Sequence, residues 1–250
     1  MLKQILILAV GVFVSLSAMA QPVTGSDSYF VYGKKLRDQG KYPEAIQAFK
    51  KATALNKNLD SAFIEWSVLC VKMNKPDDAF LVLKNALKLN PRMISCHVAL
   101  GNLYRDIKSN YDSAIICYSA VLKIDSTSKK SLYDIAWCYN AKQEFEKAIA
   151  FGTKALELDK DYKIAYNELA HAYHASKKYD EALVLFKKYA AISISDLPLF
   201  YCGMLYLELN QYDNLQKTID ELTNRGSSQS ADGLKKRWNI KKNQNPKPAE

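Results

Sequence analysis

The sequence predicts an all-α fold, a right-handed α-solenoid of about six helix-turn-helix repeats. A short pattern, an aromatic residue or proline followed three positions later by alanine, returns every 33 to 35 residues along the chain. Glycine and proline number only 9 and 7 in 250 residues, which favours long helices over turn-dense β folds. Because one helix pair cannot bury its apolar face alone, we expect successive pairs to stack.

The first 20 residues have the three-part plan of a secretory signal peptide. Lys3 supplies a positive charge, residues 5–18 are almost purely apolar, and Ala18-Met19-Ala20 is a small-x-small cleavage site. The apolar segment is shorter than the ~20 residues that a membrane-spanning helix needs. We therefore expect cleavage after Ala20, a short linker over residues 21–25, and a mature chain that is periplasmic or secreted in a bacterium.

Six repeats are predicted between residues 26 and 224. The aromatic-and-alanine pattern marks the start of the second helix of each unit, as in Tyr42 and Ala45. Another pattern lies in the first helix, and its clearest copy is the segment HVALGNLY at residues 97–104. Small residues at these positions let two helix backbones approach closely, and the bulky residues around them fill the gaps. The expected boundaries are 26–59, 60–93, 94–128, 129–162, 163–195 and 196–224.

With both patterns in phase through six copies, the chain resembles tetratricopeptide repeat (TPR) proteins over about residues 26–224. Some positions depart from the pattern of that family. Leu215 replaces the small alanine of the sixth unit, and Gly152 replaces the bulky residue four positions after the alanine of the fourth. The resemblance implies that the first helices line a concave groove and that the protein binds a protein or peptide partner.

No motif of an enzyme is present in the sequence. It has no glycine-rich phosphate loop, no paired-cysteine metal spacing, no H-E-x-x-H and no G-x-S-x-G. His171 and His174 lie three residues apart on one predicted helix, but Glu168 is expected to point to the other side and to give no third metal ligand. We therefore predict no catalytic residues, no metal site and no cofactor. A small-ligand or metal-binding protein that uses the two histidines remains the alternative.

The predicted groove has an aromatic and amide-rich surface in its third to fifth repeats. Tyr133 and Trp137 lie one helical turn apart, which suits an extended peptide whose backbone needs hydrogen-bond partners and whose side chains need apolar pockets. Arg105 and Asn102 border this surface and can accept a carboxylate. Packing of Tyr133 and Trp137 between neighbouring helices is the other interpretation. The candidate groove residues are Asn102, Arg105, Tyr133, Trp137, Asn140, Asn167, His171 and His174.

The five cysteines are predicted to be packing residues. Their number is odd, they are widely spaced, and each lies in a helix-like apolar pattern, where free cysteine behaves as a small buried hydrophobe. An exported protein would permit a disulfide, so a bridge between two of them remains open.

The basic charge is concentrated in the tail, residues 225–250. The whole chain has a net charge of +9, and this tail holds seven basic and two acidic side chains. Residues 226–230 are expected to be a flexible joint, and residues 231–240 a short helix that caps the apolar end of the repeats, where Phe200, Met204 and Leu207 need cover. Contact of the basic tail with an anionic membrane or polymer is the alternative. No basic residue recurs once per repeat as nucleic-acid binding would require.

These observations together predict an exported, non-enzymatic scaffold. We expect it to bind a protein or peptide in its groove, within an assembly of the cell envelope. The partner, the cellular process and the oligomeric state are not indicated by the sequence.

Overall fold

A computed structural model of the protein describes residues 24–244, which form thirteen helices and no strand. The chain divides into two compact units between Cys96 and His97, and each is described by itself. The predicted signal peptide lies outside the described residues. Within residues 24–244, no helix is both long enough and apolar enough to cross a membrane.

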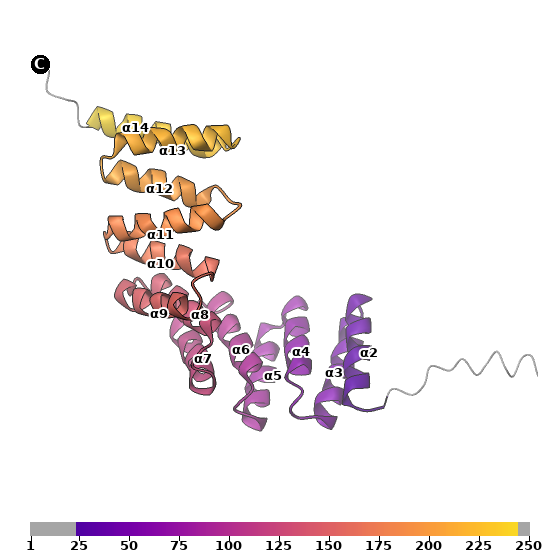
Figure 1. The fold of residues 1–250 in the computed structure, drawn as a ribbon. Coiled ribbons are helices and arrows are strands. Elements are labelled where there is room, and N and C mark those ends of the chain that lie inside the picture. Colours follow the sequence, from indigo (N-terminus) through magenta and orange to yellow (C-terminus); the bar gives the residue numbers. More distant parts are fainter. Residues whose placement is uncertain (1–23, 245–250) are drawn as a thin grey trace, which may run out of the picture. The chain divides into compact units, whose positions relative to one another are not determined.

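The first unit contains two helix pairs. Its helices are α2 (Ser26–Asp38), α3 (Tyr42–Leu55), α4 (Asp60–Lys72) and α5 (Pro76–Leu89). Each helix packs against the next along the chain, so α3 lies between α2 and α4 (Figure 1).

The second unit continues the same arrangement to the C-terminal helix. The division between the units falls inside α6 (Ile94–Asp106). The helices that follow are α7 (Tyr111–Ile124), α8 (Lys129–Ala141), α9 (Phe145–Leu158), α10 (Lys163–Ala175), α11 (Tyr179–Ile192), α12 (Leu197–Glu208), α13 (Tyr212–Asn224) and α14 (Ser228–Gln244). Here too each first helix is followed by a second helix with which it packs, as α8 with α9 and α10 with α11 (Figure 1).

The turn inside each pair uses one residue with a left-handed backbone. In the first pair it is Gly40, with φ of 75°, and in the fourth it is Gln143, with φ of 61°. The residue after it donates its backbone N–H to a carbonyl near the end of the first helix, as Lys41 to Leu36 and Glu144 to Tyr139. The equivalent left-handed residues of the other pairs are Asn74, Ser109, Lys177 and Asn210.

The turns between pairs share a different device. In the first four repeats an Asn or Asp ends the second helix in an extended conformation, and its side chain accepts the backbone N–H two residues further on; in the fifth repeat the Ser193 hydroxyl does this. Asn56 accepts from Asn58, and Asp125 accepts from Thr127. Asn90 and Asp159 do the same in the second and fourth repeats. These two turn types fix the length of each repeat.

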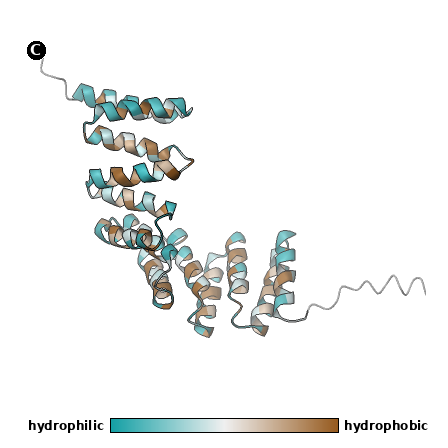
Figure 2. Cartoon of the chain, in the orientation of Figure 1, coloured by the Kyte–Doolittle hydropathy of each residue, from teal (hydrophilic) through white to brown (hydrophobic). Residues whose placement is uncertain are grey.

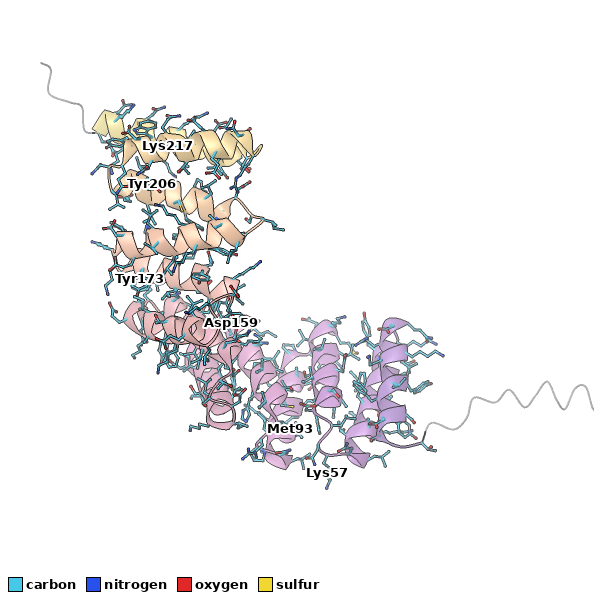
Figure 3. The ribbon with its side chains drawn as sticks, in the orientation of Figure 1. Lys57, Met93, Asp159, Tyr173, Tyr206 and Lys217 are labelled. Atoms are coloured by element: carbon cyan, nitrogen blue, oxygen red, sulfur yellow. The ribbon has the colours of Figure 1, made fainter. Side chains whose placement is uncertain are left out.

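Close packing inside a pair depends on one small residue facing one large residue. A Cβ added to Gly101 would lie 2.6 Å from the ring of Tyr118, so only glycine fits there. The fourth pair compensates for Gly152 differently, because Leu169 of α10 reaches to 3.4 Å from the point where a Cβ would stand. Apolar and hydrophilic residues alternate along the helices (Figure 2), and in the second unit Tyr206 belongs to a buried cluster against which the partly buried Tyr173 packs (Figure 3).

All five cysteines are free and buried in the structure. Burial raises the pKa of Cys96, Cys138 and Cys202 to about 12, which keeps these thiols protonated and unreactive at neutral pH. Their interpretation as packing residues agrees with this arrangement.

The tail forms the long helix α14, which packs on α12 and α13. Leu234 is fully buried against this end of the second unit, and Trp238 stacks on Tyr212 with ring centroids 5.9 Å apart. Phe200 and Met204, expected to need cover, pack partly buried against the same cluster. The expected flexible joint is instead a tight turn, because Gly226 takes a left-handed φ of 80° and α14 begins at Ser228.

Candidate functional site

The candidate groove residues come from three first helices of the second unit, α6, α8 and α10. The helix bounds place equivalent residues of successive repeats at the same position along each helix. Arg105 is the twelfth residue of α6 and Asn140 the twelfth of α8, while Asp134 is the sixth of α8 and Glu168 the sixth of α10. The twelfth residue of one first helix therefore contacts the sixth residue of the next.

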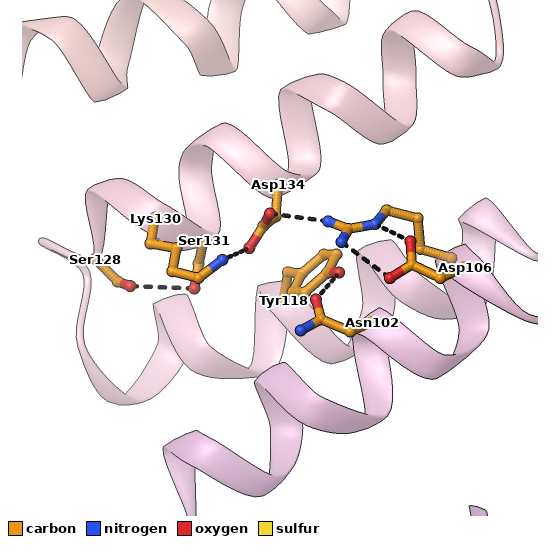
Figure 4. Close-up of polar contacts among 8 residues, drawn as sticks. Asn102, Asp106, Tyr118, Ser128, Lys130, Ser131 and Asp134 are labelled. Atoms are coloured by element: carbon orange, nitrogen blue, oxygen red, sulfur yellow. Dashed lines mark hydrogen bonds and ion pairs between the residues drawn. The ribbon is translucent and has the colours of Figure 1, made fainter. Parts of the chain in front are cut away.

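The contact between α6 and α8 is a network of charged groups (Figure 4). Arg105 donates from Nη1 to Oδ1 of Asp134 at 3.0 Å and from Nε to Oδ1 of Asp106 at 2.7 Å. Lys130 donates to the other oxygen of Asp134 at 2.9 Å. The Asp134 side chain is only 2% exposed, so both cations compensate a buried charge. Arg105 is thus already engaged by carboxylates of this chain.

Asn102 and Tyr118 form a second part of the same network. The Tyr118 hydroxyl donates to Oδ1 of Asn102 at 2.7 Å (Figure 4). Burial and the neighbouring Asp134 raise the pKa of Tyr118, so the hydroxyl keeps its proton and acts as the donor. Both residues expected to receive a partner carboxylate, Asn102 and Arg105, therefore hold internal contacts that a ligand would have to replace.

Trp137 and Tyr133 are half-buried on α8. The Trp137 ring meets Tyr111 edge-on at 5.9 Å between centroids, and the Arg105 guanidinium lies 5.2 Å from its centroid. Tyr133 meets Tyr162 edge-on at 5.9 Å, and burial raises the pKa of its hydroxyl. Each ring therefore packs against a neighbouring helix or turn, as the packing interpretation expects. Each ring also keeps part of its surface exposed, as binding in a groove requires.

The contact between α8 and α10 is built from amides and one acid. Asn140 donates from Nδ2 to the backbone carbonyl of Glu168 at 2.9 Å and to its carboxylate at 3.4 Å. Asn167 donates to the other carboxylate oxygen at 3.4 Å. Burial raises the pKa of Glu168, and the two amide hydrogen bonds offset this only in part. Glu168 faces the preceding first helix, whereas His171 faces Tyr201 of the following one, so Glu168 points to the other side from the histidine, as expected from the sequence.

His171 and His174 are held in aromatic surroundings. His171 meets Tyr201 edge-on at 4.6 Å and Phe186 at 5.2 Å, while His174 lies 5.7 Å from Tyr179. Burial and the neighbouring His174 lower the pKa of His171, which favours the neutral ring. No group of three or more His, Cys, Asp or Glu side chains suited to a metal is found within residues 24–244.

A separate hollow of about 550 Å³ lies between α9, α10 and α11. Leu156, Tyr173 and Leu185 line it, and Val184 at its edge is 53% exposed. It is formed largely by second helices, so it is distinct from the surface of the first helices and provides a second surface against which binding can be tested.

The inter-repeat polar pairs, each made by a twelfth and a sixth residue, were missed in the sequence. They recur 28 or 29 residues apart, as Arg105 with Asp134 and Asn140 with Glu168. In the first unit Arg37 donates to Glu65 at 2.5 Å in the same register. A search for complementary polar residues at that separation would have found all three pairs.

Comparisons with known proteins agree with this architecture. Residues 26–59, 129–162 and 164–193 match the family model for the tetratricopeptide repeat. The protein O-mannosyl-transferase Tmtc3 of Drosophila melanogaster is 27% identical over 107 residues, which are 43% of this chain and 12% of that protein. The chain thus spans only a small part of that relative.

Two solved structures are similar along most of the chain. YrrB, described as a TPR protein with an unusual peptide-binding site, has a TM-score of 0.63 at 19% identity, covering 76% of this chain and 99% of its own. PilW, described as a type IV pilus biogenesis factor, has a TM-score of 0.67 at 15% identity, covering 86% and 99%. The prediction of an all-α, TPR-like solenoid is confirmed, and three segments of the chain match the tetratricopeptide repeat itself.

Proposed function

We propose that the protein is an exported, non-enzymatic scaffold that binds a peptide segment of a partner protein in a cell-envelope assembly. The observation that carries this proposal is the surface of α8 and α10. There, the half-buried rings of Tyr133 and Trp137 share α8 with Asn140, and the amides of Asn140 and Asn167 both meet Glu168 of α10. Exposed aromatic surface supplies binding energy, and side-chain amides supply partners for a peptide backbone.

Export is supported by the sequence plan of residues 1–20, with its apolar segment and small-x-small site. The likeness in fold to YrrB and PilW, one described as peptide-binding and the other as a pilus biogenesis factor, is compatible with a peptide-binding role in the envelope. The likeness to Tmtc3 covers too little of that protein to bring a transferase activity to this chain.

Selection from a display library of random short peptides tests the groove. Wild type is expected to enrich a defined sequence, and the double variant Tyr133→Ala, Trp137→Ala is expected to enrich none. Because removing two half-buried rings also weakens packing, Tyr133→Leu with Trp137→Leu is the second variant, which keeps most of the apolar volume. Far-ultraviolet circular dichroism verifies that each variant retains its helices.

The hollow beside Val184 supplies the matched control. Val184→Asp changes an exposed residue of that hollow and leaves α8 unchanged. Selected peptides should bind this variant as they bind wild type. Loss of binding in Val184→Asp, with binding retained in both variants of Tyr133 and Trp137, would assign the peptide to the hollow and refute the groove.

The basic side of α14 is proposed as an accessory contact with an anionic membrane surface. Lys235, Lys236, Arg237 and Lys242 are exposed on this helix, whose one described acid is Asp232. Each such cation contributes about 1 kcal/mol near an anionic bilayer. Co-sedimentation with vesicles of anionic lipid, but not with zwitterionic vesicles, is expected at low salt and should be lost in Lys235→Gln with Lys236→Gln.

A further inference from the structure

Glu168 is a half-buried acid that lacks the cation found at the equivalent places. In the other two inter-repeat polar pairs the acid meets an arginine, as Glu65 meets Arg37 and Asp134 meets Arg105. At the third pair the arginine position is occupied by Asn140. Within the described chain no lysine, arginine or histidine lies within ion-pair distance of Glu168, and its carboxylate receives only the weak amide bonds of Asn140 and Asn167.

Asn140 is itself incompletely satisfied. Its Nδ2 group donates to Glu168, but its Oδ1 atom is buried and has no hydrogen-bond partner within the described part of the chain. A buried acceptor without a donor destabilises the fold. Two adjacent side chains, Asn140 and Glu168, therefore both have unused capacity to accept hydrogen bonds.

The cations nearby on the same surface are already committed. Arg105 is bound by Asp106 and Asp134, and Lys130 is bound by Asp134. Lys129 is paired with Asp159. A donor for Glu168 and Asn140 must therefore come from outside the chain, and water would supply a hydrogen bond without the positive charge that both arginine pairs contain.

We propose that Glu168 and Asn140 form a subsite for a cationic N–H donor of the bound peptide, a guanidinium or an ammonium group. The proposal rests on the peptide-binding function given above and adds the chemistry of the partner. Trp137 lies one helical turn before Asn140 on the same helix. In position and chemistry, the partner's cation would complete the inter-repeat polar pair that Arg37 and Arg105 complete elsewhere.

Peptides selected by display on the wild-type chain provide the test. We expect one fixed position of the selected sequence to be arginine or lysine. A synthetic peptide with citrulline or norleucine at that position should bind at least about tenfold more weakly, as expected for the loss of a hydrogen bond to a charged group. Acetylation of the peptide amino terminus distinguishes a side-chain cation from a terminal ammonium group as the source.

Glu168→Gln removes the charge with little change in shape. It should weaken the cationic peptide about tenfold or more and leave the neutral peptide unchanged, so that the two changes are not additive. The matched control is Glu181→Gln on α11, an exposed acid that should change nothing. A selected sequence without any cation, or equal loss for both peptides, overturns the subsite while leaving the groove intact. Failure to select any peptide instead refutes the groove function.

Discussion

The α6–α8 and α8–α10 contacts of the second unit use the same two helix positions for different chemistry. Between α6 and α8, Arg105 and Lys130 surround the buried Asp134. Between α8 and α10, Asn140 meets the half-buried Glu168 and leaves its own Oδ1 without a donor in the described chain. Both contacts join the twelfth residue of one first helix to the sixth residue of the next. The residue at the twelfth position therefore decides whether the acid at the sixth position has a cationic partner within the chain.

The first unit shows that an arginine at the twelfth position can also pair with a glutamate at the sixth position; we call such a contact, with an arginine, complete. Arg37 donates to Glu65 at 2.5 Å with the same separation of 28 residues that joins Asn140 to Glu168. The contact between α8 and α10, which we call open because its acid has no cationic partner in the described chain, thus differs from the complete contacts by one residue, Asn140. Substitutions at the twelfth position can convert an open contact into a complete one or the reverse.

Removing the cation from the complete contact should have the largest effect. Arg105→Leu leaves Asp134 buried with only the half-exposed Lys130 as its partner, and we expect a loss of about 3 kcal/mol in the free energy of unfolding. Urea unfolding followed by circular dichroism measures it. Arg105→Lys should be intermediate, because it retains the charge but not the two-sided donor geometry. If Arg105→Leu matches wild type, Asp134 does not need Arg105 for compensation.

Completing the open contact should have the next largest effect. Asn140→Arg places a guanidinium where Arg37 and Arg105 stand, and we expect it to stabilise the fold by about 1 kcal/mol because a half-buried acid without a cation gains a partner. The same variant should lose binding of the cationic peptide, since its own side chain fills the subsite. Asn140→Gln is the control, because it adds length without charge. A less stable Asn140→Arg that still binds the peptide would show that the two contacts are not equivalent.

The repeat pattern was readable from the sequence because it depends on local features. Turn residues such as Gly40 and size-matched pairs such as Gly101 with Tyr118 leave a fixed period of small and bulky residues. The helix bounds and the all-α class follow from that period. The exchange of a bulky residue for Gly152 broke the pattern, and only the structure shows that Leu169 fills the space.

The chemistry of the candidate surface was less predictable. The type of residue was enough to select Tyr133 and Trp137, but not to show that Arg105 is already engaged by Asp134. Glu168 was expected on the other side from His171, but its contact with Asn140 was not predicted, because that contact depends on the packing of two first helices and periodicity describes only one. A separation of 28 or 29 residues between two complementary polar residues is the sequence signal that would have indicated these contacts between first helices.

Removing the second cation from the complete contact should have a small effect. Lys130 pairs with Asp134 one turn away on the same helix, and its side chain is 57% exposed. Lys130→Gln should therefore cost about 0.5 kcal/mol, as for an exposed ion pair on a helix. The loss should also decrease at high salt, whereas the loss in Arg105→Leu should persist. Equal losses in the two variants would mean that the buried and exposed cations contribute alike.

The smallest expected effect is a difference in pH dependence between the open contact and its completed form. Burial raises the pKa of Glu168 in the folded chain, so the native state binds this proton at a higher pH than the unfolded state does. Wild type should therefore gain stability relative to Glu168→Gln as the pH falls from neutral through the raised pKa towards the ordinary range of glutamate. In Asn140→Arg the adjacent cation should lower that pKa below its value in the unfolded chain, so the stability of this variant relative to the double variant Asn140→Arg, Glu168→Gln should instead be lost as the pH falls. Thermal unfolding of the four chains at a series of pH values measures both slopes, and slopes of the same sign would contradict the assignment of Glu168 as an acid without a cationic partner.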